Sequence, residues 1–480
     1  MKLKELLQGV AVTGWAADPE LEITGVSSDT REDMKQGSLF VALSGFAFDG
    51  NRFIPKALEK GAVAVVTAKK PDMDIPHILV ENDRLALARI AANFYSHPAD
   101  AMTVIGITGT NGKTSVTWLL KQVLEKTTGT KVGLIGTMEN HIGDQVLDTD
   151  RTTPESIQLQ RLFARMREAG CRYAVMEVSS HAIALHRVEG IRFAVAAFTN
   201  LTEDHLDFHH TMEDYGRTKA RLFAHCGKAV VNADDPWGQR MVAGHSIPVV
   251  ATAVDGSGDL TAKNVAFDRN GLRFTAVFDK KSVPVQVPIP GKFTVYNVLT
   301  VLGIALQLGI ALEDAAMALR TVSGVKGRVE VVPTPGRDYT LLIDYAHTPD
   351  GLENVLSAVR GFCRGRLIAV FDCGGDRDRK KRPIMGEIGV RLADLAVITS
   401  DNPRTEVPGA IIEDIVAGLG EATNYVVVEN RVEAIHYAMD IARKDDIIVL
   451  AGKGHETYQE VMGVKHHMDE REIVAEYLEN

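Results

Sequence analysis

The stretch Thr103-Val-Ile-Gly-Ile-Thr-Gly-Thr-Asn-Gly-Lys-Thr-Ser115 decides how this chain folds, because an apolar run leads through a glycine-rich turn into a helical pattern. This order predicts a strand, a phosphate-binding loop and a helix. Gly109 and Gly112 let the backbone curl so that its N–H groups point inward. Lys113 can then reach the outer phosphates of a nucleotide, and the Thr114 hydroxyl can bind Mg²⁺. We therefore predict a site for a nucleoside triphosphate.

The loop is shorter than the strict eight-residue Walker pattern, which would need glycine at the position of Ile107. What stands at residues 109–114 is Gly-Thr-Asn-Gly-Lys-Thr. A glycine turn with an incidental lysine is the alternative interpretation. The strand and helix patterns on either side of the turn favour the nucleotide site.

Composition describes an ordinary globular chain. Its 480 residues, 45% of them hydrophobic and 24% charged, suggest about three domains. The formal charge of −10 and the lack of a long Lys/Arg block argue against a nucleic-acid partner. The first residues lack the apolar core of a signal peptide, and the longest apolar stretch, 298–312, is too short to span a bilayer. Four cysteines without a C-x-x-C pair fit a reducing compartment, so we expect a cytoplasmic protein that does not insert into membranes.

Residues 1–100 alternate short apolar strands with turns and predict a small α/β unit. The turn at 27–30, Ser-Ser-Asp-Thr, brings hydroxyl and carboxylate groups together. Phe46 and Phe48 lie in a glycine-bounded loop where they could stack on a base. Taken alone, both segments are interpreted as surface loops.

From Thr103 onward strands and helices alternate, which predicts a largely parallel sheet with ligands at its carboxyl edge. The strand that ends at Glu177 places a carboxylate at that edge beside the phosphate loop, so Glu177 is a candidate metal ligand. The next strand ends in a segment that contains His205 and His209. Their spacing would suit a zinc pair on a helix, but oxygen-rich surroundings favour Mg²⁺, and solvated loop histidines are a third interpretation. Lys219, on a predicted amphipathic helix, has the sequence context of a surface lysine.

The last third restarts the alternation after a β-rich connection. Asn297 is predicted to open a helix, and the Pro-Thr-Pro-Gly turn at 333–336 marks a second boundary. Each following strand ends in a loop rich in Gly, Asp, Arg or His, as in an open Rossmann-like sheet. Two of these loops carry Arg377 and Arg404. The arginines suit a substrate with more than one carboxylate, although ordinary salt bridges would explain either one.

The predicted fold is therefore α/β with three domains. Residues 1–100 form a small α/β domain, 101–331 a central P-loop-type nucleotide-binding domain, and 332–480 a Rossmann-like domain.

Six motifs, in this order and spacing, resemble the Mur ligases, the ATP-dependent amide-forming enzymes of peptidoglycan precursor synthesis. They are Ser27-Ser-Asp-Thr-Arg31, Gly37-Ser-Leu-Phe-Val41, the loop at 109–114, Glu177-Val-Ser-Ser-His181, Asp344-Tyr-Ala-His-Thr-Pro349 and Asp401-Asn-Pro-Arg404. The resemblance implies an enzyme that uses ATP and Mg²⁺ to add meso-2,6-diaminopimelate to the D-Glu side-chain carboxylate of UDP-N-acetylmuramoyl-L-Ala-D-Glu through an acyl phosphate. A monomer is expected. A lysine-adding relative and a folylpolyglutamate synthetase-like ligase are the nearest alternatives, and a P-loop kinase or ATPase that forms no amide is a rival of another class.

The resemblance also assigns residues to roles. The catalytic set is Lys113, Glu177, His205 and Lys219, and the metal set is Thr114, Glu177, His205 and a Lys219 carbamylated by CO₂. Residues implied for ATP are Gly109, Thr110, Asn111, Gly112, Lys113, Thr114, Ser115, Asn297, Arg328 and Asp344. Those implied for the UDP-muramoyl-dipeptide are Ser28, Thr30, Thr152, Thr153, Ser179 and Arg187. Those implied for diaminopimelate are Arg377, Asp401, Asn402, Pro403, Arg404, Gly452 and Glu456.

The residues implied for diaminopimelate fit the chemistry of that amino acid. Diaminopimelate differs from lysine by a second amino-acid head, whose carboxylate suits Arg404 and whose ammonium suits an acid such as Glu456.

Overall fold

A computed structural model describes residues 1–31, 34–45, 49–268 and 271–479 of the chain. It divides into two compact units. The first contains residues 1–251 with 303–310, and the second contains residues 252–302 with the chain from 311 onward.

The N-terminal part of the first unit holds a five-stranded sheet in the order β1-β5-β4-β3-β2, parallel except for β1. Leu39, Val41 and Val66 lie in the core beneath it, where α3 also packs. The small α/β unit predicted from the sequence is confirmed. Its elements are α1 Leu3–Leu6, β1 Val12–Ala16, β2 Gly25–Ser27, β3 Ser38–Ala42, η1 Gly50–Phe53, α2 Ile54–Glu59, β4 Ala62–Thr67, β5 His77–Val80, α3 Asp83–Phe94 and η2 Pro98–Ala101.

The rest of the first unit is built on strands in the order β12-β11-β6-β10-β7-β8-β9. Pairing is parallel from β11 to β7, and antiparallel where β8 and β9 extend the edge. This confirms the predicted largely parallel sheet. The elements are β6 Thr103–Thr108, α4 Lys113–Thr128, β7 Val132–Ile135, β8 Asn140–Ile142, β9 Gln145–Leu147, α5 Ser156–Glu168, β10 Tyr173–Glu177, α6 Ser180–Ala184, β11 Phe193–Phe198, α7 Leu206–His209, α8 Met212–Ala220, η3 Arg221–His225, β12 Cys226–Asn232 and α9 Gly238–Met241.

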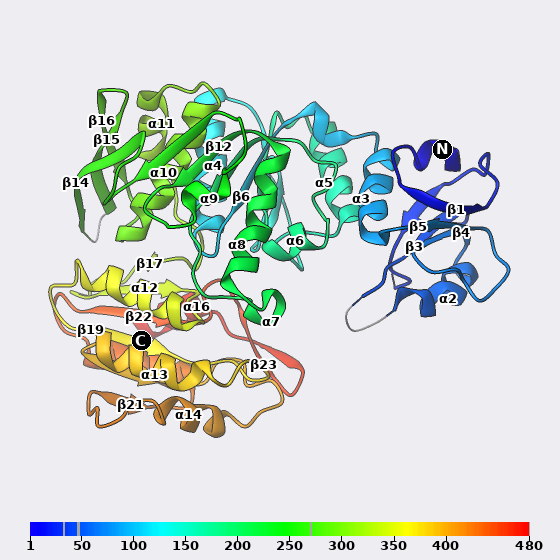
Figure 1. Cartoon of the computed structure of the whole chain (residues 1–480). Coiled ribbons are helices and arrows are strands. Elements are labelled where there is room, and N and C mark those ends of the chain that lie inside the picture. The colour runs from blue at the N-terminus through cyan, green and yellow to red at the C-terminus, as the bar shows by residue number, and fades with distance from the viewer. Residues whose placement is uncertain (32–33, 46–48, 269–270, 480) are drawn as a thin grey trace. The chain divides into compact units, whose positions relative to one another are not determined.

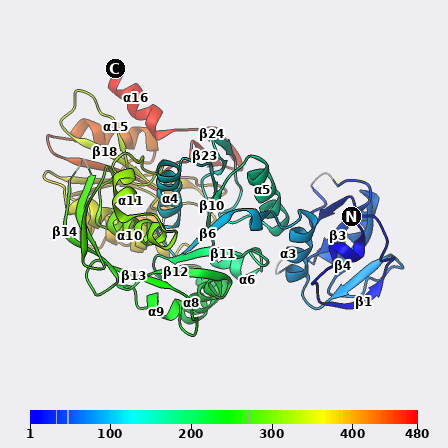
Figure 2. The same cartoon turned by 90° about the horizontal axis from the view of Figure 1, so that it is seen from above.

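Apolar side chains explain why the strands of this sheet are central. The strands β6, β10 and β11 are almost entirely buried, and Phe163, Phe193 and Phe198 pack in the core on the sheet. Helix α4 packs on β6, β10 and β7, and Figure 2 shows it beside β6 and β10. Because β11, β6 and β10 are parallel neighbours, the loops that follow them meet at one edge.

The second unit begins with an antiparallel set of β14 Leu260–Asp268, β15 Gly271–Phe278 and β16 Lys281–Val287, on which α11 Leu312–Leu319 packs. The strand β13 Val249–Ala253 and the helix α10 Lys292–Gln307 cross the boundary between the units. The prediction that a helix opens at Asn297 is wrong, because the helix begins five residues earlier. Gly291, at φ +102°, lets the chain turn directly into it.

The remainder of the second unit is a six-stranded sheet in the order β17-β18-β22-β19-β20-β21, parallel except for β17. The open Rossmann-like sheet predicted from the sequence is confirmed. The elements are β17 Glu330–Val332, β18 Thr340–Asp344, α12 Pro349–Arg360, β19 Leu367–Phe371, α13 Lys381–Leu392, β20 Leu395–Ile398, α14 Pro408–Val416, β21 Tyr425–Val427, α15 Arg431–Ile441, β22 Ile447–Ala451, β23 Tyr458–Val461, β24 Val464–His467 and α16 Glu470–Glu479.

Helices cover both faces of this sheet (Figure 1). Leu356 of α12, Met385 of α13 and Ile415 of α14 belong to one apolar layer. Ile435 of α15 and Val474 of α16 belong to the other. With both faces buried, ligands can reach the sheet only at its strand ends.

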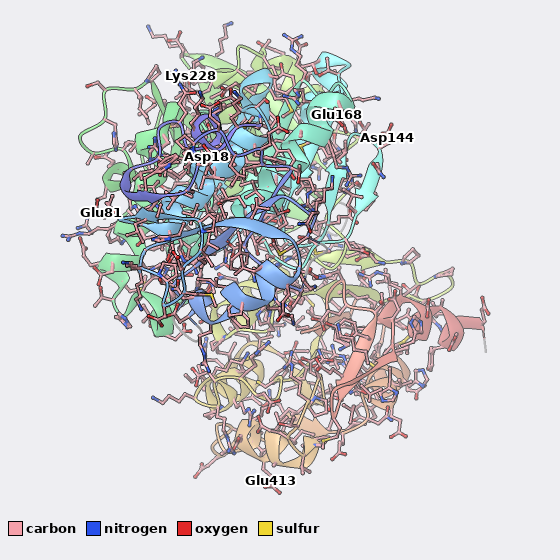
Figure 3. All side chains as sticks on the ribbon, turned by 90° about the vertical axis from the view of Figure 1, so that its right-hand side faces the viewer. Asp18, Glu81, Asp144, Glu168, Lys228 and Glu413 are labelled. Carbon is pink, nitrogen blue, oxygen red and sulfur yellow. The ribbon has the colours of Figure 1, made fainter. Side chains whose placement is uncertain are left out.

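Charged side chains are exposed on the outer surface. No helix in the described ranges is long and apolar enough to cross a membrane. All four cysteines are free. Figure 3 labels six charged side chains that are exposed to solvent: Asp18, Glu81, Asp144, Glu168, Lys228 and Glu413.

Candidate functional site

The glycine-rich loop has the shape that its sequence predicted. Gly109 and Gly112 have φ values of +144° and +86°, which favour glycine. A Cβ atom at Gly109 would overlap the Thr199 hydroxyl at the end of β11. The loop therefore depends on glycine, and α4 begins directly after it at Lys113. The predicted order of strand, loop and helix is confirmed.

The neighbouring strand end holds the loop in place. The backbone N–H of Thr110 donates to the Asn200 carbonyl at 2.8 Å, and that of Asn111 donates to Asn200 Oδ1 at 2.9 Å. Thr199 Oγ1 donates to the Asn111 carbonyl at 2.6 Å. These contacts fix the loop against β11, while Thr114 and Ser115 lie in the first turn of α4.

Two lysines converge on the loop. Lys113 Nζ lies 2.9 Å from the carbonyl oxygen of Gly109, and Lys219 Nζ reaches the same oxygen at 2.9 Å from α8. Lys219 also lies 4.4 Å from the centroid of the Tyr215 ring. It is 1% exposed, so its interpretation as a surface lysine is wrong. The buried face of α8 carries it toward the loop, where burial and the Lys113 ammonium hold the pKa of Lys219 well below its usual range.

Glu177, at the end of β10, joins the phosphate loop to a second loop. Its buried carboxylate accepts the Thr114 hydroxyl at 3.1 Å. It also accepts the backbone N–H and the hydroxyl of Thr137, at 2.9 and 3.0 Å. Thr137 Oγ1 lies 3.0 Å from Thr152 Oγ1 as well. The sequence analysis missed Thr137, although its place just after β7, a parallel neighbour of β10, predicts the same sheet edge.

The residues predicted to hold the muramoyl-dipeptide lie next to this junction. Thr153 Oγ1 donates to the Glu177 carbonyl at 2.9 Å and accepts the backbone N–H of Ser179 at 3.1 Å. Arg187 donates to the Thr153 carbonyl at 3.1 Å and pairs with Glu155 at 2.7 Å. The structure therefore gathers Thr152, Thr153, Ser179 and Arg187 around Glu177.

The two histidines of the next loop have different surroundings. His205 is exposed just before α7, 3.3 Å from Asp204, and its pKa falls through burial of part of the ring and through the charges of Lys113 and Lys219. His209 is buried, hydrogen-bonds Ser180 Oγ at 2.8 Å, and stacks on a tyrosine ring. Burial lowers the pKa of His209 to about 4. Among the described residues, no group of three or more His, Cys, Asp or Glu side chains is placed to hold a metal ion.

Part of the predicted metal set fits Mg²⁺. Thr114 and Glu177 present a hydroxyl and a carboxylate in contact, and both are hard oxygen donors of the kind that Mg²⁺ takes. The charges of Lys113 and Lys219 help to lower the pKa of His205, so the three side chains lie near one another. A free Lys219 amine offers no oxygen, so its place in the set requires the predicted carbamate.

The turn predicted to contact uracil follows β2. Thr30 is 5% exposed and Ser28 is half-buried, so the turn is not a simple surface loop. Asp29 pairs with Arg31 at 2.6 Å. Phe46 and Phe48 lie outside the described residues.

In the second unit, Arg328 lies just before β17, and Asp344 is the last residue of β18 in the six-stranded sheet. The Arg328 guanidinium lies 5.1 Å from the Tyr345 ring centroid. Asp344 is buried and accepts the backbone N–H of Val329 at 2.8 Å. Burial raises the pKa of Asp344, and the charge of Arg328 opposes that rise. Asn297, the third predicted contact, is buried within α10.

Three of the residues predicted for diaminopimelate, Asp401, Asn402 and Glu456, meet around Lys453, which was not predicted from the sequence. Lys453 is fully buried in the loop after β22, and its ammonium donates to Asp401 Oδ1 at 3.0 Å and Asn402 Oδ1 at 3.3 Å. Asn402 Nδ2 donates to Glu456 Oε2 at 2.9 Å. Burial and the charge of Asp401 raise the pKa of Glu456. Lys453 thus joins the loop after β20 to the loop after β22.

The two arginines differ. Arg404 is half-buried, donates to the Gly375 carbonyl at 2.7 Å and lies 3.6 Å from a Glu460 carboxylate oxygen. Arg377 is exposed, with its guanidinium 3.5 Å from the Asp376 carbonyl. Arg404 therefore forms a salt bridge with Glu460, which is the alternative role considered from the sequence. Its hydrogen bond to the Gly375 carbonyl holds the guanidinium in place.

A second buried cation lies beneath this site. Arg431 is 1% exposed, pairs with Asp372 and Glu470, and donates to the Ala451 carbonyl at 3.0 Å. Gly452 needs its glycine here, because its φ is +120° and a Cβ atom would overlap the Asp372 carboxylate. Sequence pattern alone did not indicate this network.

Comparisons with known proteins give a consistent result. Three family profiles match the chain: "Mur ligase family, catalytic domain" at residues 22–95, "Mur ligase middle domain" at 107–305, and "Mur ligase, glutamate ligase domain" at 327–454.

Relatives match over the full length. The chain is 47% identical to UDP-N-acetylmuramoyl-L-alanyl-D-glutamate–2,6-diaminopimelate ligase 1 of Clostridium acetobutylicum, with 100% of this chain and 99% of the relative covered. It is also 47% identical, at the same coverage, to the ligase of that name from Caldanaerobacter subterraneus subsp. tengcongensis. A solved structure of a ligase with that name matches with a TM-score of 0.74 and 29% identity, covering 100% of this chain and 99% of that one.

Proposed function

The chain belongs to the Mur ligase family, and we propose that it adds meso-2,6-diaminopimelate to UDP-N-acetylmuramoyl-L-Ala-D-Glu in peptidoglycan precursor synthesis, as a ligase of the MurE type. ATP is cleaved to ADP and phosphate to drive amide formation. The 47% identity over the full length to ligases named for this activity supports the choice of both substrates.

One observation carries the proposal on the structural side. A chain of hydrogen bonds leads from Thr114 of the phosphate loop through Glu177 and Thr137 to Thr152. It connects the candidate triphosphate residues to the candidate dipeptide residues within one unit. A kinase or ATPase needs a phosphate loop, but an amide ligase must also hold a carboxylate within reach of the γ-phosphate.

The proposed reaction has two steps. An oxygen of the D-Glu side-chain carboxylate attacks the γ-phosphorus of ATP, so that the acyl phosphate forms and ADP leaves. The free amine of diaminopimelate then attacks the acyl carbon, and the tetrahedral intermediate loses phosphate, and one proton from its nitrogen, to give the amide. Lys113 and the backbone N–H groups of the loop would hold the phosphates, and Arg187 would hold the dipeptide.

Lys219 is proposed to carry a carbamate. Its neutral amine would attack the carbon of CO₂, form an N–C bond and release one proton, so that a neutral group becomes an anion; starting from the ammonium, two protons are released in all. Burial supports this chemistry, because a lysine kept from water favours its neutral, nucleophilic amine.

Mg²⁺ would be held by Thr114 and Glu177, with His205 and the Lys219 carbamate as further ligands. When bound, it would neutralise the phosphate and carboxylate anions so that they can approach each other. Asn297, Arg328 and Asp344 are proposed contacts of the nucleotide, and Ser28 and Thr30 of the uridine group.

Selection of diaminopimelate is assigned to the loops around Lys453. Arg404, with Arg377, would bind the carboxylate of the second amino-acid head. Asp401, Asn402 and Glu456 would face its ammonium, and Pro403 and Gly452 would shape the loops. L-lysine lacks that carboxylate and would gain nothing from Arg404.

We also propose the domain assignment made from the sequence, with a substrate-binding domain at 1–100, an ATP-binding domain at 101–331 and an amino-acid-binding domain at 332–480. A cytoplasmic monomer is proposed with it.

The test is an amide-product assay with ATP, Mg²⁺ and the UDP-muramoyl-dipeptide against a panel of amino acids, with ADP release recorded in parallel. Diaminopimelate should give the tripeptide product, and ADP release should require both substrates. Preference for L-lysine would overturn the choice of amino acid. ADP release without any amino acid would favour the ATPase alternative.

A further inference from the structure

The hairpin of β23 and β24, residues 458–467, contacts the loop at 401–404. Its two strands are antiparallel, with Glu460 opposite Lys465 and Val461 opposite Val464. Met462 and Gly463 form the turn at φ values of +49° and +78°, as in a tight type I′ turn. With such a two-residue turn, Glu460 and Lys465 form a non-hydrogen-bonded pair, so their backbone groups face away from the partner strand.

The backbone of this hairpin pairs with the 401–404 loop. The Glu460 N–H donates to Asn402 Oδ1 at 2.8 Å, and its carbonyl accepts the N–H of Arg404 at 3.1 Å. The Arg404 carbonyl in turn accepts the N–H of Met462 at 2.7 Å, beside a parallel bridge between Arg404 and Val461. The loop therefore lies along the hairpin like a short third strand.

Side chains add to this attachment. Gln459 Nε2 donates to the Asp401 carbonyl at 2.7 Å, and the Glu460 carboxylate lies 3.6 Å from Arg404 Nε. Arg404 has a φ of +53°, an unfavourable conformation for a side chain that is not glycine. A loop released from the hairpin would be free to leave that conformation and move the guanidinium.

We propose that the hairpin is a specificity element, in which Gln459 and the backbone of Glu460 are positioning residues that hold Asp401, Asn402 and Arg404 in the geometry that recognises the second head of diaminopimelate. This inference rests on the proposed function. Neither Gln459 nor the Glu460 backbone needs to touch the substrate, because each acts through the loop.

This positioning role predicts different effects on the use of diaminopimelate and of L-lysine as substrates. Diaminopimelate needs Arg404 in place to bind its second carboxylate, whereas L-lysine has no such group. Loosening the loop lowers the use of diaminopimelate and leaves the use of lysine almost unchanged. A general loss of fold would lower both and would weaken ATP binding as well.

Two variants test this in the full-length enzyme. Gln459→Met keeps the length of the side chain and removes its hydrogen bond to Asp401. Glu460→Pro removes the N–H that donates to Asn402, together with the carboxylate that lies 3.6 Å from Arg404 Nε, and leaves the pairing with β24, because that N–H faces outward. Lys465→Pro is the matched control, since it places the same residue at the outward position of β24.

Steady-state amide formation is measured with diaminopimelate and with L-lysine, together with the KM for ATP. Gln459→Met should raise the KM for diaminopimelate by roughly 3- to 10-fold, as expected for one lost hydrogen bond, and Glu460→Pro should raise it at least as much, with kcat and the KM for ATP unchanged. The ratio of kcat/KM values for diaminopimelate and lysine should fall by the same factor. Lys465→Pro should keep the wild-type ratio.

Two results would overturn the role of the hairpin: an unchanged ratio in both test variants, or equal losses with diaminopimelate, lysine and ATP. Either result, with a wild type that adds diaminopimelate, leaves the proposed function intact. A wild type that adds no diaminopimelate overturns the proposed function together with this inference.

Discussion

The phosphate loop and the 401–404 loop both follow the carboxyl ends of parallel strands, yet they handle charge in different ways. At the phosphate loop, the side-chain nitrogens of Lys113 and Lys219 both contact one carbonyl oxygen, and the charge of Lys113 helps to lower the pKa of Lys219. At the 401–404 loop, opposite charges are already paired, Asp401 with Lys453 and Arg404 with Glu460.

The difference matches the ligands proposed for the two loops. A triphosphate is only negative, so backbone N–H groups and cations suffice to receive it. Diaminopimelate carries both signs at its second head, so its site needs both, and burying either sign alone would be costly. Removing one charged group should therefore lower the free energy of unfolding most at the 401–404 loop. At the phosphate loop it should lower the turnover of the enzyme most.

The largest effect is expected for Lys453→Met. It leaves the buried Asp401 carboxylate without its cation and should lower the free energy of unfolding by about 3–5 kcal/mol. Urea denaturation measures the change. Lys465→Met, which removes an exposed lysine from β24, is the control and should cost little. Equal stability of the two variants would contradict the idea that paired charge supports this loop.

Lys219→Ala should reduce turnover strongly and stability less, which is the reverse of the effect expected for Lys453→Met. We expect turnover to fall by about 100-fold or more, because an essential charge at the reacting groups is lost, while urea denaturation changes less than in Lys453→Met. ADP release and amide product are measured together. Acetate or formate, which restores a carboxylate, should recover part of the activity. Arg217→Ala, an exposed residue of the same helix, should keep normal turnover. Unchanged turnover in Lys219→Ala would remove this lysine from the mechanism.

Sequence pattern predicted the parts of both sites that depend on strand order. Glu177 follows a predicted strand beside the phosphate loop, so its place at the same sheet edge could be inferred. The loops at Asp401 and Gly452 follow strands of a predicted parallel sheet for the same reason. Helix and strand patterns are local, and the parallel sheet then fixes which loops meet.

What the pattern could not predict is the side of an element that a polar residue faces. Lys219 lies in a helix of mostly polar residues, and its burial follows from the packing of α8 against the phosphate loop. Lys453 and Arg431 are buried because carboxylates from distant strands surround them. Such pairings are set by tertiary contacts and leave no periodic signal in the sequence.

Arg404→Lys sharpens the comparison without removing charge. Lysine keeps the positive sign but loses the planar fork that fits a carboxylate, so kcat/KM for diaminopimelate should fall by roughly 10-fold. The KM for ATP and the use of L-lysine should stay near the wild type. Arg379→Lys, an exposed arginine that pairs with Asp414, serves as the control. A matching rise in the KM for ATP would contradict a role limited to the amino acid.

The smallest effect concerns acid stability, and it again belongs to the unit with paired charges. Hydrogen bonds from Arg382 to Glu406 lower the pKa of that carboxyl from 4.5 to about 2. Because the folded pKa lies below the unfolded one, this stabilisation is present above pH 4.5 and is lost as pH falls toward about 2. Glu406 remains partly exposed, so the contribution should stay below about 1 kcal/mol. Urea denaturation at about pH 5.5 and about pH 3 should show a smaller pH dependence in Glu406→Gln than in the wild type. Parallel losses in the two proteins would mean that other carboxyl groups carry the acid sensitivity of this unit.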